Sequence, residues 1–136
     1  MTAVIAVIAI GAYPLRGRRE ARHDGWMTTT ADGRTIELSR DDEDRRYAAR
    51  IGGALIGEAD FVLSPGLVVF THTIIDPALE GQGIGTALVR FALDDVRASG
   101  VLALPYCPFV RAFVKRHADE YGDLVYRPPA GAAEGF

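Results

Sequence analysis

The sequence predicts one α/β domain, in which a mixed, mostly antiparallel sheet is extended by a strand-helix-strand crossover and a second helix. Three observations support this fold class. Residues 35–63 alternate polar and apolar side chains in short runs separated by turn signals, which is typical of antiparallel strands. A glycine-rich turn then opens a segment with helical periodicity, and a short apolar strand follows. With 49% hydrophobic and 24% charged residues among 136, the composition is that of a single globular domain.

Charge and cysteine content exclude several classes of function. The chain has 15 Lys and Arg against 18 Asp and Glu, a net charge of -3. Binding of nucleic acid relies on an excess of clustered cations, so we expect no nucleic-acid partner. The one cysteine, Cys107, cannot form an intramolecular disulfide or a Cys-x-x-Cys metal site. We therefore expect a reducing, cytoplasmic setting and no bound metal.

The N-terminal stretch is interpreted separately. Met1–Ile10 is apolar and is followed by four arginines before Met27. This run is too short for a bilayer, which needs about 20 apolar residues. In a secretory signal, the positive charge would precede the apolar run. We interpret residues 1–33 as an N-terminal extension or a misassigned start that lies outside the domain. An anchor at the membrane interface is the minor alternative for this segment.

The domain itself is expected over residues 34–127, with a flexible tail rich in Pro, Ala and Gly over 128–136. Its first strand is Thr35–Leu38, and the charged residues 41–46 form a solvated turn. Two glycines, Gly52-Gly53, mark a tight hairpin turn.

The strand after this hairpin is expected to place one set of residues on the core face and Glu58 and Asp60 on the opposite face. The core set is Leu55, Gly57, Ala59, Phe61 and Leu63.

A change of pattern follows the turn at Ser64-Pro65-Gly66. Leu67–Ile75 is a nearly continuous apolar run, which indicates a central strand covered on both faces. Apolar residues at helical spacing then predict a helix over Thr86–Ser99, and Val101–Leu104 is a short strand. This order implies a right-handed crossover and parallel pairing with the Leu67–Ile75 strand. Pro108 suits the first turn of a last helix that ends near His117.

The glycine segment Gly81–Gly85 is the most informative feature for function. Glycines between a strand and a helix let backbone N–H groups approach a ligand, and the helix dipole favours negative charge there. A phosphate-bearing ligand is therefore indicated, although such turns are also common as plain connections. The chain has no Gly-Lys-Ser/Thr loop for a nucleoside triphosphate and no Gly-x-Gly-x-x-Gly turn after an initial strand.

Four short motifs stand in order along the chain. They are His72-Thr73-Ile74-Ile75, Gly81-Gln82-Gly83-Ile84, Cys107-Pro108-Phe109-Val110, and His117 with Glu120-Tyr121-Gly122-Asp123-Leu124-Val125. Together with the order of elements, they resemble the GNAT superfamily of N-acetyltransferases, and within it the compact YjdJ-type branch. The resemblance extends over roughly Ile36–Val125.

This resemblance implies an enzyme, an acyltransferase that moves an acetyl group from acetyl-CoA directly to an amine. It makes the glycine turn the loop that binds the CoA pyrophosphate. The cofactor-binding residues that it implies are Thr73, Ile74, Ile75, Gly81, Gln82, Gly83, Ile84, Gly85, Cys107 and Phe109. Because the chain lacks the extra helices of larger relatives, we expect an open site for a small-molecule amine or a protein amine. The sequence identifies neither the acceptor nor the oligomeric state.

Three residues depart from the superfamily pattern. Glu80 stands where Arg or Gln is usual, so backbone amides must do more of the pyrophosphate binding. Ile74 occupies a position that is often acidic, and Phe113 one that is often Tyr. The last two changes remove one candidate base and one candidate acid.

His72 and Cys107 are the candidate catalytic residues. An amine of pKa about 10.4 is mostly protonated at neutral pH, so acyl transfer needs a base, and an imidazole is suited to that task. We expect His72 to be this base, with a structural histidine as the alternative. Cys107, as the predicted N-cap of the last helix, has its thiolate favoured by the helix dipole.

Cys107 is therefore a candidate acid toward the CoA sulfur or a candidate acetyl carrier. A small buried packing residue is the alternative. His117 lies ten residues further, about 15 Å along the same helix, and is interpreted as a residue of the helix C-terminus.

Two other classes of function remain open. A CoA-binding module with little or no catalysis is the main alternative, because Phe113 and Ile74 lack the polar groups of relatives. A structural or partner-binding domain, with the glycine turn unused, is the third.

Overall fold

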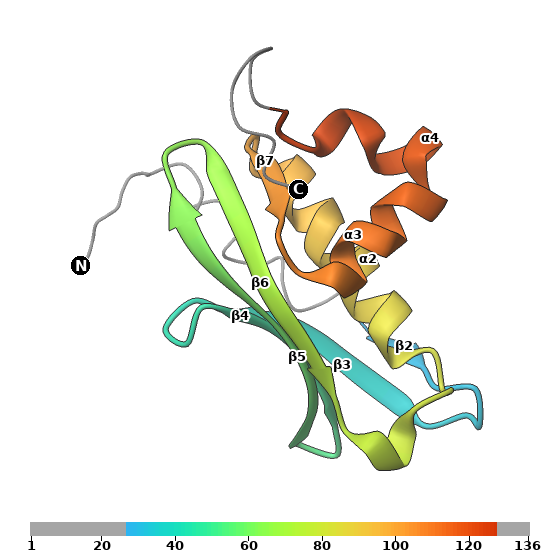
Figure 1. Cartoon of the computed structure of the whole chain (residues 1–136). Helices are drawn as coiled ribbons and strands as arrows, with labels where there is room; N and C mark the ends of the chain where they lie inside the picture. The colour runs from blue at the N-terminus through green and yellow to red at the C-terminus, as the bar shows by residue number, and fades with distance from the viewer. Residues whose placement is uncertain (1–26, 128–136) are drawn as a thin grey trace.

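The computed structural model describes residues 27–127, and Figure 1 shows the chain as a curled sheet with its α-helices on one side. Residues 1–26 of the predicted extension 1–33, and the whole predicted tail 128–136, lie outside the described residues. The sheet has six strands in the order β2-β3-β4-β5-β6-β7. Every neighbouring pair is antiparallel except β6 and β7, which are parallel. The predicted fold class is confirmed.

The elements have the following bounds. The strands are β2 (Met27–Thr29), β3 (Thr35–Asp41), β4 (Arg46–Ile51), β5 (Ala54–Ser64), β6 (Leu67–Ile75) and β7 (Leu102–Pro105). The helices are η1 (Pro77–Leu79), α2 (Ile84–Ala98), α3 (Pro108–Arg116), α4 (Ala118–Tyr121) and η2 (Gly122–Leu124).

Strand β2 corrects the predicted start of the domain. Met27–Thr29 pairs antiparallel with β3, and Thr30 in the following turn is buried. The domain therefore begins before residue 34. The short polar run Met27–Gly33 gave no alternation long enough to indicate a strand, because only three residues pair.

The hairpin turn between β4 and β5 contains the two glycines from which it was predicted. Gly52 and Gly53 both have positive φ, at 59° and 84°, as the tight β4–β5 hairpin requires. A second β4–β5 feature was not predicted, a register shift between Ala49 and Arg50. Such irregularities bend a strand and increase its twist, which suits the curl of this sheet.

One core forms between the sheet and the helices. Its largest fully buried side chains come from β3, β4, β6, β7, α2 and α3, and include Tyr47, Phe70, Leu88, Leu93 and Phe113. The ring of Tyr47 lies 5.2 Å from that of Phe61 and 5.9 Å from that of Phe91, measured between centroids, so β4, β5 and α2 are locked together. Predicted core residues Leu55 and Leu63 are exposed instead, because they lie near the two ends of the long strand β5.

The interpretation of β6 as covered on both faces holds for only half of the strand. Val68, Val69 and Phe70 are buried, whereas residues 71–75 alternate between half-buried and exposed. The exposed residues are His72 and Ile74, because their side chains lie on the face opposite to that of Thr73, which contacts Cys107 on the helix side.

Candidate active site

The glycine segment forms the N-terminal end of α2. Gly81 and Gly83 have positive φ, at 86° and 83°, and Gly83 is the N-cap residue of the helix. Within residues 27–127, the N–H groups of Gly83, Ile84, Gly85 and Thr86 have no hydrogen-bond acceptor. The first turn of α2 carries no acidic side chain. Free amides at the positive end of a helix dipole bind anions, so this loop is suited to a phosphate group.

The side chain of Gln82 holds this loop in place rather than facing a ligand. Its Oε1 accepts a hydrogen bond from the backbone N–H of Asp32 at 3.1 Å. Its backbone carbonyl accepts another from Ala31, also at 3.1 Å. The turn between β2 and β3 is thereby joined to the glycine loop, although this turn lies within residues 1–33, the predicted N-terminal extension.

Gly85 is required by packing. A Cβ atom at this position would lie 2.7 Å from Cζ of Phe109, which is closer than real Cβ contacts allow. Phe109 stands in the first turn of α3, so this contact brings the N-terminal ends of α2 and α3 together. Because α3 also has no acidic residue in its first turn, two positive helix ends converge at one place.

The gap between β6 and β7 opens beside these helix ends. Their parallel pairing ends at Phe70 and Pro105, after which the N–H of Cys107 donates to the carbonyl of Phe70 at 2.9 Å. From this point β7 turns into α3, and β6 continues to Ile75 with a free edge among the described residues. A register shift between β5 and β6 falls at the same level, beside Asp60 and Phe61. Bulges of this kind are frequent next to active sites.

Cys107 lies on the helix side of this gap. It is the N-cap residue of α3, as predicted, but its side chain makes no capping hydrogen bond. The thiol is 2% exposed, and its Sγ lies 3.3 Å from Oγ1 of Thr73 on β6. The structure therefore brings together Cys107 and Thr73, two of the predicted site residues.

His72 lies on the opposite face of β6. Neighbouring residues of a strand point to opposite sides, and Thr73 points to the helices. The His72 side chain is 61% exposed, and its Nε2 lies 3.2 Å from Oδ2 of Asp60 on β5. The two candidate catalytic residues are thus not in contact. They lie on opposite sides of the strand edge at which the gap opens.

The other residues of β6 divide in the same way. Ile74 is 54% exposed on the His72 face. Ile75 points into the domain, where its Cδ1 would lie 2.9 Å from a Cβ atom at Gly57. The side chain of Ile84 is buried, so only its backbone N–H can reach a ligand.

A network of charged side chains surrounds Asp60 on the open face. Arg46 on β4 lies 3.3 Å from Oε1 of Glu58 and 3.4 Å from Oδ2 of Asp41. Burial, followed by the hydrogen bond and charge of Asp60, raises the pKa of the Glu58 carboxyl, against the opposing effect of Arg46. Sequence reasoning predicted that Glu58 and Asp60 share this face, but the strand register that pairs Asp60 with His72 could not be obtained from it.

Phe113 and His117 are structural. Phe113 is fully buried, and His117 stacks on it with ring centroids 4.2 Å apart. Nδ1 of His117 lies 2.9 Å from the Phe113 carbonyl oxygen at the end of α3. This agrees with the interpretation of His117 as a residue of the helix C-terminus.

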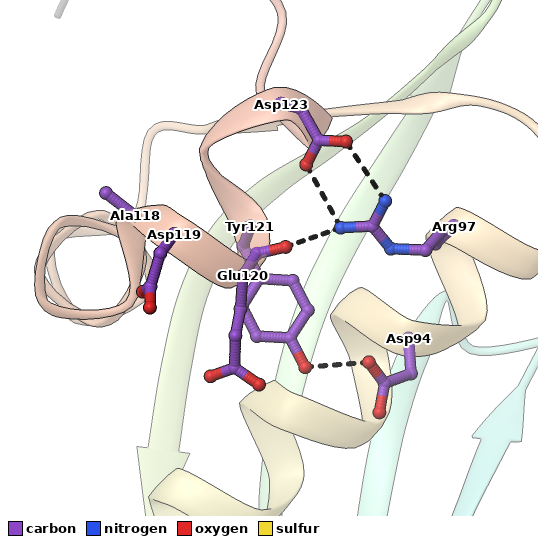
Figure 2. A pocket seen from close by; sticks show the side chains of 7 residues that line it. All are labelled: Asp94, Arg97, Ala118, Asp119, Glu120, Tyr121 and Asp123. Atoms are coloured by element: carbon purple, nitrogen blue, oxygen red, sulfur yellow. Dashed lines mark hydrogen bonds and ion pairs between the residues drawn. The ribbon is translucent and has the colours of Figure 1, made fainter.

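A shallow recess lies at the other end of α2 and is shown in Figure 2. Arg97 binds Asp123 at 3.1 Å, and the hydroxyl of Tyr121 donates to Asp94 at 2.7 Å. Burial, then the hydrogen bond to Asp94, raises the pKa of Tyr121 to about 12. Asp94 follows Gly83 by eleven residues, about 16 Å along the helix, so these contacts fasten α4 and η2 to α2 away from the glycine loop.

No group of three or more His, Cys, Asp or Glu side chains among residues 27–127 is arranged to hold a metal ion. In the same part of the chain, no helix has the length and apolar character needed to cross a membrane.

Comparison with known proteins identifies the family. A family model described as GCN5-related N-acetyl-transferase matches residues 46–124, more than half of the chain. The chain therefore belongs to the GCN5-related N-acetyltransferase family, a family of transferase enzymes. This confirms the superfamily to which the sequence motifs pointed.

Among solved structures, the chain is similar to the ribosomal-protein-S18-alanine N-acetyltransferase from Escherichia coli, with 17% sequence identity and a TM-score of 0.47. The similarity covers 54% of this chain and 52% of that protein, so the chain spans about half of its length. No curated protein matches the sequence.

Proposed function

We propose that the protein is an N-acetyltransferase that binds acetyl-CoA at the Gly81–Gly85 loop and transfers the acetyl group to an amine. The observation that carries this proposal is the set of free backbone N–H groups at Gly83–Thr86, next to the point where β6 and β7 separate. The N-terminal end of α2, which is suited to phosphate, thus lies close to the open edge of β6. Acetyl-CoA, with a pyrophosphate at one end and a thioester at the other, matches both.

The loop residues fit the pyrophosphate. Four free amides and two converging helix ends supply positive potential without a cationic side chain, which offsets the presence of Glu80 at the loop start. Gln82 supports the pyrophosphate site indirectly, because its hydrogen bonds to Ala31 and Asp32 hold the glycine loop in place.

The thioester is supplied by acetyl-CoA when it is bound, and the residues of the gap act on it. The free edge of β6 offers the backbone N–H and C=O groups of those residues in 71–75 that are not hydrogen-bonded to β5, which alternate along the strand. Cys107 and Thr73 lie on the helix side of this edge, where a thiol or hydroxyl can donate a proton to the departing sulfur.

The acceptor amine approaches from the open face of the sheet, where His72 is exposed. His72 accepts the proton that the amine loses as the new C–N bond forms. The placement of His72 and Cys107 on opposite sides of β6 supports separate tasks for them, base and acid. It also favours direct transfer, because a buried Cys107 is shielded from an acceptor on the open face.

A CoA-binding module without catalysis is the second candidate. Phe113 has no hydroxyl and is sealed in the core, and Ile74 gives the open face an apolar group where relatives often have an acid. Phe113 and Ile74 therefore supply neither the acid nor the base that relatives often have at these positions.

Release of free thiol from acetyl-CoA distinguishes these candidates. We expect the full chain to release thiol faster when a polyamine, a lysine-containing peptide or a peptide with a free α-amine is added, with the acetylated amine detected by mass spectrometry. Binding of acetyl-CoA without any amine-dependent release would support the module instead. Absence of binding would contradict both.

A further inference from the structure

We propose that Asp60 is a positioning residue that fixes the tautomer of His72 and so assigns Nδ1 as the atom that accepts the amine proton. This inference rests on the proposed function. It begins from the 3.2 Å separation of Asp60 Oδ2 and His72 Nε2 across β5 and β6.

The pair is held by the backbone of both strands. Asp60 and His72 are direct partners in the antiparallel register, immediately before the shift at Asp60 and Phe61. On the strand that carries His72, the hydroxyl of Thr71 donates to the backbone carbonyl of Asp60 at 3.2 Å. The backbone therefore places the carboxylate and the imidazole opposite one another at the bulge, beside the open edge of β6.

Asp60 has a second partner on this face, because Glu58 shares a side-chain hydrogen bond with it; burial, followed by this bond, raises the pKa of the Glu58 carboxyl. Glu58 stands two residues earlier on the same face, and Arg46 binds Glu58 from β4. The side chain of Asp60 is about one-quarter exposed, whereas that of His72 is mostly exposed. Asp60 thus reaches solvent less than its partner does, and the far side of the imidazole faces the open surface.

Hydrogen-bonding chemistry then determines the tautomer. An ionised carboxylate can only accept, so a neutral imidazole facing it at Nε2 must carry its hydrogen there. The lone pair is left on Nδ1. When an amine forms a bond to the acetyl carbon, its proton passes to Nδ1, and the electron pair of the breaking C–S bond leaves with sulfur. Asp60 then provides the negative charge that stabilises the imidazolium.

This arrangement also accounts for the apolar residue at position 74. The strand that carries His72 has no acidic side chain on its open face, because Ile74 stands there. The neighbouring strand β5 supplies a carboxylate instead, and it acts through His72 rather than on the amine.

Long-range 1H–15N NMR of the histidine rings tests the tautomer without any need for activity. The chain has three histidines, so a His72→Gln variant assigns the signal. We expect the Nε2–H tautomer in the wild type and a shift toward the Nδ1–H tautomer in Asp60→Asn, whose amide can donate to Nε2. Asp42→Asn is the matched control, since Asp42 is also paired, at 2.8 Å from Arg40, and should change nothing at His72. An Nδ1–H tautomer in the wild type, or no change in Asp60→Asn, would overturn the proposal.

Kinetics test whether Asp60 acts through His72. Asp60→Asn should lower kcat for amine acetylation by about tenfold or more with KM for acetyl-CoA unchanged, and Asp60→Glu should recover part of the loss. In a His72→Ala background, Asp60→Asn should have no further effect. An equal loss in both backgrounds would mean a purely structural role for Asp60 and would contradict the inference.

Failure of the proposed function and failure of the positioning role of Asp60 give different results. If the wild type shows the expected tautomer but acetylates no amine, the proposed function is wrong and Asp60 has no catalytic task. If the wild type acetylates amines with kinetics indifferent to Asp60, only the positioning role is wrong.

Discussion

Cys107 shows how position and burial limit the role of a single side chain. Its place at the N-terminal end of α3 was predictable from Pro108, and its burial matches the alternative of a small buried residue, but its contact with Thr73 was not predictable. A thiol enclosed beside the gap can give a proton to sulfur, whereas an acetyl carrier must also be reached by the acceptor. The burial of Cys107 and its contact with Thr73 therefore favour a role as proton donor to the CoA sulfur over a role as acetyl carrier.

We therefore expect Cys107→Ala to retain measurable acetylation, reduced by roughly tenfold, and His72→Ala to lose more, on the order of a hundredfold. Initial rates with saturating acetyl-CoA measure both. Intact-protein mass spectrometry should detect no acetyl group on Cys107 that hydroxylamine removes. Complete loss of activity in Cys107→Ala, together with such a thioester in the wild type, would establish a carrier mechanism instead.

At the scale of elements, the turn after β2 is the part of the fold that most affects the candidate site. Ala31 and Asp32 hold Gln82 through two hydrogen bonds, and Thr30 closes the turn by accepting from the N–H of Arg34 at 2.8 Å. A glycine loop has little conformational restraint of its own. Its preorganisation for a ligand therefore depends on this neighbouring turn.

A chain that begins at Met27 should unfold at nearly the same temperature as the full chain and bind CoA equally well. A chain that begins at Thr35 lacks β2 and the turn, and should bind CoA up to about thirtyfold more weakly, since two hydrogen bonds to Gln82 are lost at about 1 kcal/mol each. Calorimetry and thermal unfolding give both quantities. A large loss of stability in the chain starting at Met27 would show that the preceding residues matter to the domain.

At the scale of the whole molecule, the C-terminal elements are attached to α2 by charged and aromatic contacts. The guanidinium of Arg90 lies 5.5 Å from the ring centroid of Phe113 and 5.7 Å from that of Tyr121. Tyr121 also donates to Asp94 (Figure 2). These contacts give the stability of the domain a defined dependence on alkaline pH.

The pKa of Tyr121 is raised from 10.0 to about 12 in the folded protein. A raised pKa means that folding favours the protonated hydroxyl, so this stabilisation is complete below pH 10 and is lost as pH rises toward 12. We expect the urea midpoint to fall over this interval, and Tyr121→Phe to be less stable at neutral pH but to decline less between pH 10 and 12. Parallel declines in the two proteins would contradict this role for Tyr121.

The sequence was informative wherever local chemistry determined the structure. Paired glycines at 52–53, the strand Leu67–Ile75, the glycine turn and the start of α3 at Pro108 were all predicted and confirmed. Long-range register was not accessible. The pairing of Asp60 with His72 depends on a bulge, and the hold of Asp32 on Gln82 joins residues fifty positions apart. Neither contact produces a pattern of neighbouring residues in the sequence, so neither could be predicted. Both contacts lie at the candidate site and not in the core.

Calorimetry with acetyl-CoA tests the central claim, that the free amides of the glycine loop bind this substrate. Gly83→Val should abolish binding that is micromolar in the wild type, because a side chain at φ 83° disturbs the N-cap from which those amides point. Gly66→Val is the matched control: its φ is 72°, it lies in the β5–β6 turn, and binding should persist. Both variants should unfold cooperatively. Binding in folded Gly83→Val equal to that of the wild type would contradict the account.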